Sequence, residues 1–440
     1  MTFFKSIAKL ICVLSVLAIT RCEAEVTFPK VIGNNMVLQQ NKAIVIWGNA
    51  AVGEQITVTF GKQVKKVVAD EFGRWKIALD PMAASARPAT MTIAGTNVIQ
   101  LHDILIGEVW LCSGQSNMEY TMRKNSKVVK IDSLQKNSPI DELQRANNPA
   151  IRIFLVTSKN LQKPDSTHSG WSIARDSALR SFSAAGYFFA KELYEKLHVP
   201  IGVISSAVPG SAIEPWLPGA VPTLEKTLSA GEHLQLDESK PGKFFPSMVR
   251  PLAPFAIKGF LWYQGETNCF QNESIEYTYK LESLIKGWRN TWNDTTLPFY
   301  YVQIAPFYYS KSAGKYPLTK ETLPKFWEAQ AMAMKIRHTG MITTTDLVAT
   351  PEDLHPPFKW EIGRRLAQWA LANQYHLKVV PTGPMFKEKR TIDNRIELTF
   401  DFTGSGLTSR DGKPLSQFLI AGADKQFHTA WKSNGDCYCL

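Results

Sequence analysis

The sequence predicts an α/β protein: a three-layer α/β/α domain with a parallel sheet, flanked by an N-terminal β-sandwich domain and a partial C-terminal β module. Residues 25–103 alternate short β-rich runs with Gly and Asn turns, as a small sandwich does. Residues 104–376 alternate strand-like runs with helix-like runs such as 183–197 and 323–336, which is typical of a parallel sheet covered by helices. Residues 377–440 return to β-like runs.

The first 24 residues are typical of a secretory signal peptide. Lys5 and Lys9 precede an apolar run, and the small residues around Ala24 suit signal peptidase. The apolar run is short for a membrane span, so we expect cleavage rather than a stable membrane anchor. The predicted location is therefore outside the cytoplasm, periplasmic or extracellular.

Composition and charge narrow the possible functions. The chain has 440 residues, 44% of them hydrophobic, which is enough for two or three domains with a large core. Its formal net charge is +11, but the basic residues are scattered and no nucleic-acid-binding motif accompanies them, which excludes a nucleic-acid partner. The cysteines show no metal-site spacing, so we expect neither a metal nor another cofactor. Cys112 and Cys269 either pair or remain buried thiols.

The strongest functional signal follows the apolar, strand-like run at residues 98–111. The sequence CSGQSNM at residues 112–118 then delivers Ser116 on a turn of small residues. A serine esterase needs a base near its hydroxyl and donors aimed at the developing oxyanion. Gly114 allows close approach of the backbone, and Gln115 and Asn117 flank the serine with amide groups. Ser116 is the candidate nucleophile; the alternative is an ordinary turn or helix cap.

A candidate base lies near the other end of the same predicted domain. The sequence EDLHPP at residues 352–357 places two carboxylates just before His355, ahead of a helix-like run. A catalytic histidine needs an acidic partner that fixes its tautomer and stabilises the imidazolium, and Asp353 or Glu352 could provide it. Alternatively, the two acids favour the N-terminus of the following helix, and His355 is a surface residue.

Two further strand-like runs end in polar turns. Residues 258–263 lead into Gln264, Gly265 and Asn268, which can donate to an oxyanion or to a sugar. Residues 200–206 lead into a turn where Gly210 can present its backbone N–H, although a plain turn is also compatible with this pattern. In open α/β sheets, ligands bind at such strand ends.

These segments together resemble the sialate O-acetylesterase family, a branch of the SGNH hydrolases, and are similar to certain bacterial acetylxylan esterases. The motifs that carry the resemblance are NMVLQ (35–39), GEVWLCSGQSNM (107–118), GSAIEPW (210–216), WYQGETN (262–268) and DLHP (353–356). The resemblance implies an SGNH-hydrolase-like fold with Ser116 as nucleophile, His355 as general base and Asp353 as its orienting acid. It also implies three oxyanion donors: the N–H groups of Ser116 and Gly210 and the amide of Gln264. The substrate-binding residues that it implies are Gln115, Asn117, Glu266 and Asn268.

The chain departs from the family pattern in three places. Pro209 replaces one of two adjacent glycines, and proline has no backbone donor, so Gly210 has to serve alone. Many SGNH enzymes place the acid three residues before the histidine, whereas the sialate esterases place it two before; we therefore rank Asp353 above Glu352, with Asp346 third. In relatives the C-terminal β module continues for several more strands, so we expect residues 377–440 to form a truncated module.

The expected activity is hydrolysis of an acetyl ester on a sugar hydroxyl through an acetyl-serine intermediate. The first candidate substrate is 9-O-acetyl sialic acid, for which an arginine near Ser116 would suit the carboxylate. An acetylxylan esterase acting on plant polysaccharide is the alternative enzyme. A non-catalytic carbohydrate-binding protein with the same pocket is the alternative from another class.

Overall fold

The computed structural model describes residues 25–128, 139–156, 170–219 and 242–439, apart from positions 349, 394, 410, 414, 417, 425 and 433–436. The predicted signal peptide, residues 1–24, lies outside the described residues. Over the ranges that are described, no helix is long and apolar enough to cross a membrane.

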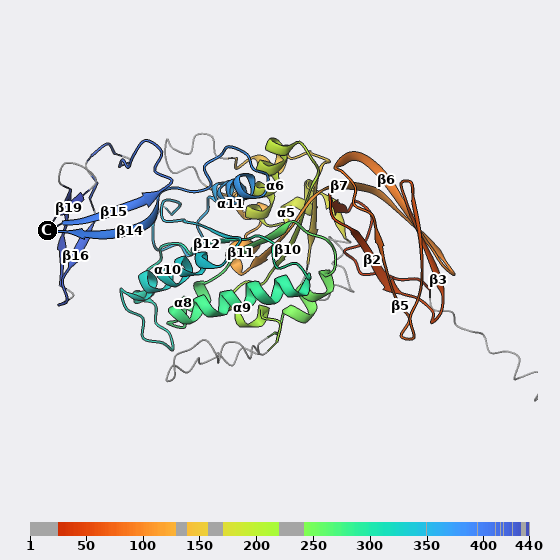
Figure 1. Cartoon of the computed structure of the whole chain (residues 1–440), viewed down its shortest axis with the longest axis horizontal. Helices are drawn as coiled ribbons and strands as arrows, with labels where there is room; N and C mark the ends of the chain where they lie inside the picture. Colours follow the sequence, from red (N-terminus) through yellow and green to blue (C-terminus); the bar gives the residue numbers. More distant parts are fainter. Residues whose placement is uncertain are drawn as a thin grey trace, which may run out of the picture.

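The centre of the molecule is a parallel sheet (Figure 1). Its strands are β7 (Val98–Gly114), β8 (Ile151–Leu155), β10 (Ile201–Ala207), β11 (Gly259–Tyr263), β12 (Phe299–Val302) and β13 (Thr339–Ile342). They lie in the order β13-β12-β11-β7-β10-β8, and β9 (Trp171–Ile173) adds an antiparallel edge next to β8. Nearly every residue of these parallel strands is buried, apart from the first part of β7, because both faces of the sheet are covered.

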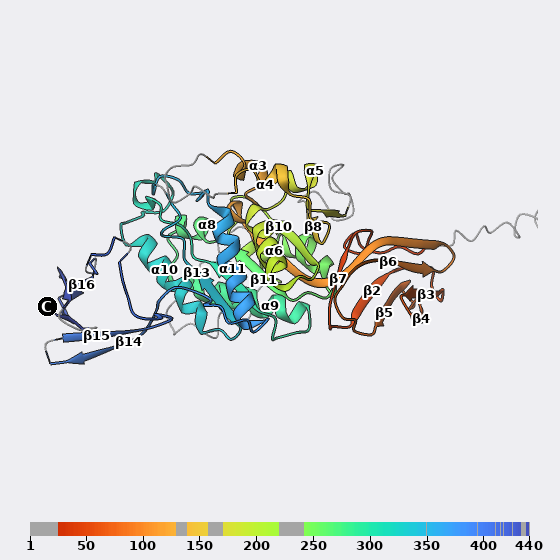
Figure 2. The same ribbon diagram turned by 90° about the horizontal axis from the view of Figure 1, so that it is seen from above.

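Helices cover the two faces of this sheet (Figure 1), and Figure 2 looks down onto one of these faces. One face carries α6 (Ala184–Leu197) and α11 (Lys359–Asn373), whose apolar side chains share a core with Trp110 of β7. The other carries α9 (Ile275–Thr291) and α10 (Thr322–Met332), which pack on Trp262 of β11. The predicted three-layer α/β/α architecture is therefore confirmed.

Short helices connect the larger elements. They are α2 (Ser116–Glu119), α3 (Met122–Asn125), α4 (Glu142–Arg145), α5 (Asp176–Arg180), α8 (Glu266–Phe270) and the 3-10 turn Glu214–Trp216. Two of them, α2 and α8, directly follow β7 and β11 and so begin at the same edge of the sheet.

The N-terminal part is rich in β structure, as predicted. Its strands are β1 (Val37–Gln39), β2 (Ile44–Asn49), β3 (Gln55–Phe60), β4 (Gln63–Val68), β5 (Arg74–Leu79) and β6 (Ser85–Ala94). β2 pairs with β5, while β3 pairs with β4 and β6, and β6 pairs with the first part of β7. β5 alternates exposed and buried residues, as expected for a strand with one face on a core. The predicted domain boundary at residues 103 and 104 falls inside β7, which continues without a break into the central sheet.

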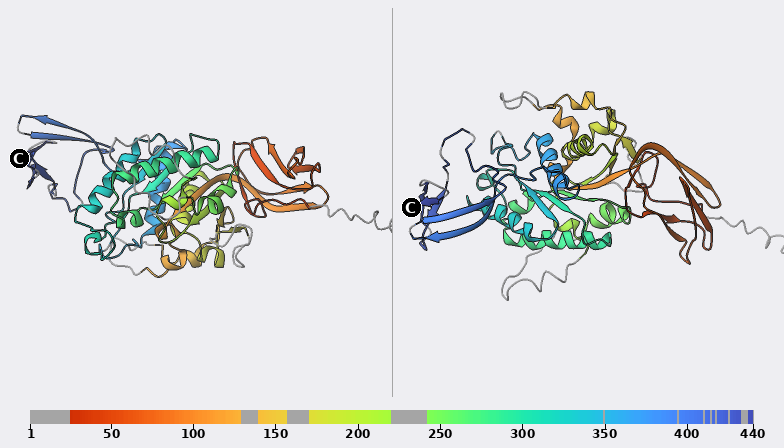
Figure 3. Two further views of the ribbon diagram at one scale, coloured as in Figure 1. Left: turned by 90° about the horizontal axis from the view of Figure 1, so that it is seen from below. Right: turned by 45° about the horizontal axis from the view of Figure 1, so that its top comes forward.

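The C-terminal strands lie at the opposite end of the molecule from the N-terminal ones (Figure 3). They are β14 (Met385–Ile392), β15 (Arg395–Asp401), β16 (Leu419–Ala421), β17 (Phe427–Thr429), β18 (Trp431–Lys432) and β19 (Cys437–Cys439). Four of them form the sheet β14-β15-β19-β18, and β16 pairs with β17. The predicted β character of this region is confirmed.

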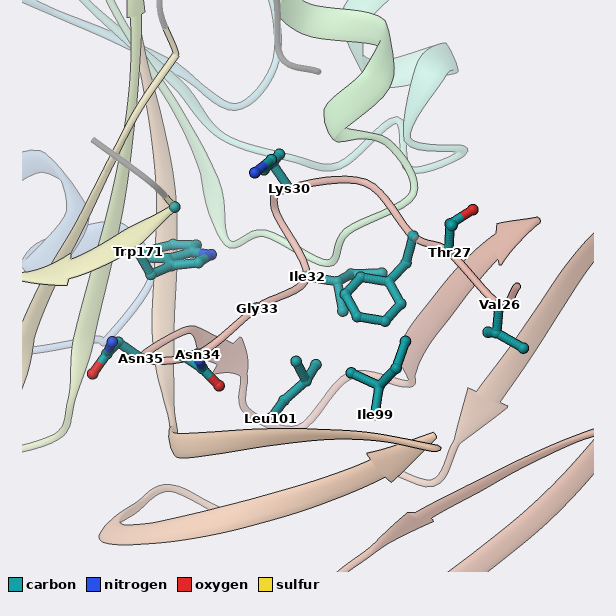
Figure 4. Close-up of a pocket in the computed structure, with 12 residues that line it drawn as sticks. Val26, Thr27, Lys30, Ile32, Gly33, Asn34, Asn35, Ile99, Leu101 and Trp171 are labelled. Carbon is teal, nitrogen blue, oxygen red and sulfur yellow. The ribbon is translucent and has the colours of Figure 1, made fainter. Parts of the chain in front are cut away.

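A cavity of about 460 Å³ lies where the N-terminal segment meets the start of β7 (Figure 4). Ile99 and Leu101 of β7, Trp171 of β9 and the loop bearing Asn34 and Asn35 line it. This cavity is at the opposite end of β7 from Ser116, so the predicted active-site residues do not contribute to it.

Candidate active site

Ser116 lies at the point where the strand order of the sheet changes direction. β7 is central, with the later strand β10 on one side and β11 on the other. The carboxyl ends of strands at such a switch point form the usual binding crevice of open α/β sheets. Gly114 makes the turn possible: its φ is +140°, and a Cβ there would lie 2.1 Å from the carbonyl oxygen of Tyr263.

The predicted nucleophile and base are in contact. Oγ of Ser116 lies 2.9 Å from Nε2 of His355, although the two residues are 239 positions apart. His355 lies on the loop between β13 and α11, and both side chains are half-buried. This distance is within hydrogen-bond reach, as a serine and its general base require.

The three candidate acids lie in different places. Asp353 Oδ1 accepts a hydrogen bond from the backbone N–H of His355 at 2.8 Å, and no acceptor for Nδ1 of His355 is found among the described residues. Glu352 is exposed. Asp346 is paired with the guanidinium of Arg365 at 2.6 Å. Asp353 is thus the candidate acid that contacts His355, and its orienting role stays a prediction.

The environment of His355 favours the neutral imidazole. Burial lowers the pKa of His355, and the positive charges of Lys359 and Lys124 lower it further, while Asp353 raises it. Because the net shift of this pKa is downward, the ring is unprotonated at neutral pH and can accept a proton from Ser116.

Two of the three predicted oxyanion donors are backbone N–H groups. Within the described ranges, the N–H groups of Ser116 and Gly210 donate to no protein acceptor. Gly210 has a φ of +71°, and its carbonyl oxygen accepts from Thr267 Oγ1 at 3.2 Å. These two N–H groups are thus not engaged by the described part of the protein, and their role as oxyanion donors stays a prediction.

The amide of Gln264 is already engaged by the protein. This wholly buried side chain donates from Nε2 to Gln115 Oε1 at 3.2 Å, to the Ser211 carbonyl at 3.2 Å and to Asn268 Oδ1 at 2.7 Å. An amide nitrogen carries two protons, so neither is left for a substrate in this arrangement. Gln264 therefore stabilises the loop between β10 and the 3-10 turn Glu214–Trp216, which we call the Gly210 loop. Its role as a direct oxyanion donor stays a prediction.

The four predicted substrate-binding residues lie beneath the site. Gln115, Asn117, Glu266 and Asn268 are between 0% and 2% exposed. Gln115 Oε1 accepts from the N–H of Gly265 at 3.3 Å, and Asn268 Oδ1 accepts from the N–H of Ile213 at 3.0 Å. Asn117 Nδ2 donates to Glu266 Oε1. These bonds make the four residues supports of the surrounding turns, and direct contact with a substrate stays a prediction.

Sequence reasoning missed Lys359. Its Nζ is buried and donates to Asn117 Oδ1 at 2.6 Å and to the Pro356 carbonyl at 2.8 Å. Burial lowers the pKa of Lys359 to about 7, although Glu266 and Asp353 raise it. The local signal in the sequence is a lysine between two aromatic residues, Phe358 and Trp360, at the start of an amphipathic helix.

A second buried charge cluster, formed by Lys280, Glu214 and Glu273, packs next to the Gly210 loop. Lys280 of α9 contacts Glu214 and lies 2.7 Å from Glu273, and the Lys280 side chain is 1% exposed. Both carboxylates also accept from Asn268 Nδ2, at 3.3 Å and 3.1 Å. The cluster therefore fixes the side chain of Asn268, whose Oδ1 accepts hydrogen bonds from Gln264 and from the backbone of the Gly210 loop at Ile213.

Cys112 and Cys269 are both buried and unpaired, which decides between the two states predicted for them. Burial raises the pKa of both thiols well above its ordinary value, so neither is a reactive thiolate.

Comparison with known proteins agrees with this geometry. The chain is similar to human sialate O-acetylesterase, with 32% identity over 319 residues, covering 65% of this chain and 58% of the human protein. It is 28% identical to mouse sialate O-acetylesterase, covering 85% of this chain and 79% of the mouse protein. The crystal structure of a carbohydrate acetylesterase from Xanthomonas citri matches with a TM-score of 0.80 and 32% identity, covering 94% of this chain and 90% of that one. The family model for carbohydrate esterases described as sialic acid-specific acetylesterases matches residues 106–372. The chain therefore belongs to this carbohydrate esterase family.

Proposed function

We propose that this protein is a serine esterase that removes O-acetyl groups from sugars, with O-acetylated sialic acid as the first candidate substrate. The observation that carries the proposal is the 2.9 Å contact between Ser116 Oγ and His355 Nε2 at the carboxyl end of the central strand. The names of the human and mouse relatives support sialate as the sugar. Export through the leader at residues 1–24 belongs to the same proposal, and N-terminal sequencing of secreted protein tests it.

The geometry suits a two-step acyl transfer. His355 takes the proton of Ser116 as Oγ attacks the acetyl carbonyl carbon, and the protonated ring then gives that proton to the departing sugar oxygen. The same ring then takes a proton from a water molecule that attacks the acetyl-serine carbonyl, and returns a proton to Ser116 Oγ as the ester bond breaks and acetate leaves. The N–H groups of Ser116 and Gly210 stabilise the oxyanion in both steps. Asp353 stabilises the imidazolium through its negative charge.

An acetylxylan esterase is the second candidate. The charged groups that shift the pKa of His355 are Lys359, Asp353 and Lys124, and no arginine is among these described residues. Lys124 of α3 lies 3.3 Å from Glu119 Oε2 and is the partly exposed cation of this group. A carboxylate-bearing sugar would suit a cation such as Lys124, whereas acetylated xylose is neutral and needs no cation. The name of the Xanthomonas relative specifies only a carbohydrate acetylesterase.

Acetate release tests the proposal. The purified chain and its Ser116→Ala variant are assayed in parallel on O-acetylated sialic acid and on acetylated xylan. Release that the variant abolishes supports the serine esterase, and the preferred substrate decides between the two sugars. A folded protein that retains acetylated sugar but releases no acetate would contradict the proposal in favour of a non-catalytic binding protein.

A further inference from the structure

We propose that Lys359 and Asn117 are positioning residues that hold the two peptide carbonyls on either side of His355 and so fix the base against Ser116. We call this pair the carbonyl clamp. The inference deepens the proposed function and rests on it.

The contacts of the clamp surround His355 in the chain. The carbonyl oxygen of Leu354 accepts from Asn117 Nδ2 at 3.0 Å, and the carbonyl oxygen of Pro356 accepts from Lys359 Nζ at 2.8 Å. The two clamp residues are joined to each other, because Lys359 Nζ donates to Asn117 Oδ1 at 2.6 Å. Asn117 directly follows the nucleophile, so the clamp links the turn that carries Ser116 to the loop that carries His355.

The His355 loop needs such support. Among the described residues, the ring of His355 forms a hydrogen bond with Ser116 through Nε2 and has no partner at Nδ1. No carboxylate therefore orients the ring through a hydrogen bond to Nδ1. The position of the ring is set instead by its backbone, with Asp353 accepting from the His355 N–H and the clamp holding both adjacent carbonyls. Reactive geometry demands placement of the base to a fraction of an ångström.

The position of Lys359 is unfavourable for a cation. It is 0% exposed and is the first residue of α11, where the helix dipole opposes a positive charge. Its Nζ lies 4.8 Å and 5.1 Å from the ring centroids of Tyr120 and Tyr263, which offset part of the burial penalty. An apolar side chain of the same length would fill this space without the penalty. The two hydrogen bonds to Asn117 and Pro356 account for what the lysine adds.

The clamp also acts through charge. The groups that shift the pKa of His355 are Lys359 of α11, Asp353 of its own loop and Lys124 of α3, while Glu266 of α8 faces Lys359. The cation of Lys359 lowers the pKa of His355, so its removal raises that pKa. A neutral amine keeps two N–H donors, so the hydrogen bonds persist when Lys359 loses its proton.

Lys359→Met and Asn117→Ala test the clamp. We expect each variant to lower kcat by about a hundredfold, because a displaced base reacts poorly, with little change in KM. We expect the double variant to be far less impaired than the product of the single effects, because both remove one connected unit. NMR titration of the His355 ring, assigned with His355→Gln, should show a higher pKa in Lys359→Met.

Arg289→Met is the matched control. Arg289 is also a buried cation that donates to backbone carbonyls, those of Leu297 and Arg337, at 2.8 Å and 2.9 Å, but it lies at the amino ends of β12 and β13. Its variant should lose stability while kcat and the His355 titration stay unchanged. Folded Lys359→Met and Asn117→Ala proteins with wild-type kcat, or with a kcat loss no greater than that of Arg289→Met, would overturn the clamp. An unchanged pKa of His355 in Lys359→Met would overturn its electrostatic part. An inactive wild-type protein would instead count against the proposed function, and the NMR titration can still be read in that case.

Discussion

Replacing Lys280 with methionine should destabilise the protein severely, whereas the same change six positions later on the same helix should not. Lys280 is 1% exposed and serves two carboxylates, those of Glu214 and Glu273. Lys286 is 62% exposed and pairs at 2.6 Å with Glu282, one turn away. The two substitutions remove the same charge from α9 and differ in what is left behind.

The expected magnitudes follow from burial. Removing one partner of a buried ion pair leaves an uncompensated charge and costs about 3–5 kcal/mol. A surface pair at this helical spacing contributes about 0.3–0.5 kcal/mol. For a cooperative unit of more than about 250 residues, 1 kcal/mol shifts Tm by about 1–2 °C, so we expect a decrease of roughly 3–10 °C for Lys280→Met and of at most about 1 °C for Lys286→Met.

The Tm of both variants is measured by thermal unfolding, monitored through tryptophan fluorescence, at pH 5 and at pH 8. Burial raises the pKa of Glu273, and Lys280 opposes that shift. Without Lys280 the pKa of Glu273 rises further, so the folded variant favours the protonated acid and loses stability as pH increases through this pKa. The deficit relative to wild type should therefore be larger at pH 8. Equal decreases in Tm for the two variants, or a larger deficit at pH 5, would refute the reasoning.

Three further predictions concern the active site. The pH profile of kcat/KM should rise on its acid side below about 6.5, the ordinary pKa of histidine, because burial and Lys359 lower the pKa of His355; a limb above that value would contradict the assignment. Gly114→Ala should lower the free energy of unfolding by at least about 2 kcal/mol, measured in urea, because its Cβ would meet the Tyr263 carbonyl, whereas Gly53→Ala, with φ +76° and open space, should cost about 1 kcal/mol. Gln264→Ala should slow acetate release by about a hundredfold by loosening the Gly210 loop; a wild-type rate would show that neither this loop nor a direct donor depends on Gln264.

The sequence could predict the esterase class and the contact between two candidate groups because strand-to-turn transitions are local. The apolar run before Gly114 and the acids before His355 are visible along the chain, and the sheet brings Ser116 and His355 together at 2.9 Å. The parallel sheet and its helical layers follow from alternating apolar runs in the same way.

Other features depend on neighbours that lie far apart in the sequence. Polar residues near a candidate site look like ligand contacts until their partners are known, and the structure shows that Gln264 and Asn268 are bonded to the protein. Lys359 was missed because its sequence neighbours, Phe358 and Trp360, do not indicate that Tyr120 and Tyr263, far away along the chain, cover its amine. Local composition also suggested a break at residue 103, inside a strand that continues.

The continuity of β7 has a consequence for how the molecule unfolds. Its 17 residues span about 55 Å. The first part of β7 pairs with β6 of the N-terminal region, and the last part pairs with β10 and β11 of the central sheet. The N-terminal strands cannot swing on a hinge, because no loop separates them from the strand that presents Ser116. Amide hydrogens along β7 should exchange with solvent only when the N-terminal β region and the central sheet open together. We therefore expect these two regions to unfold as one cooperative unit.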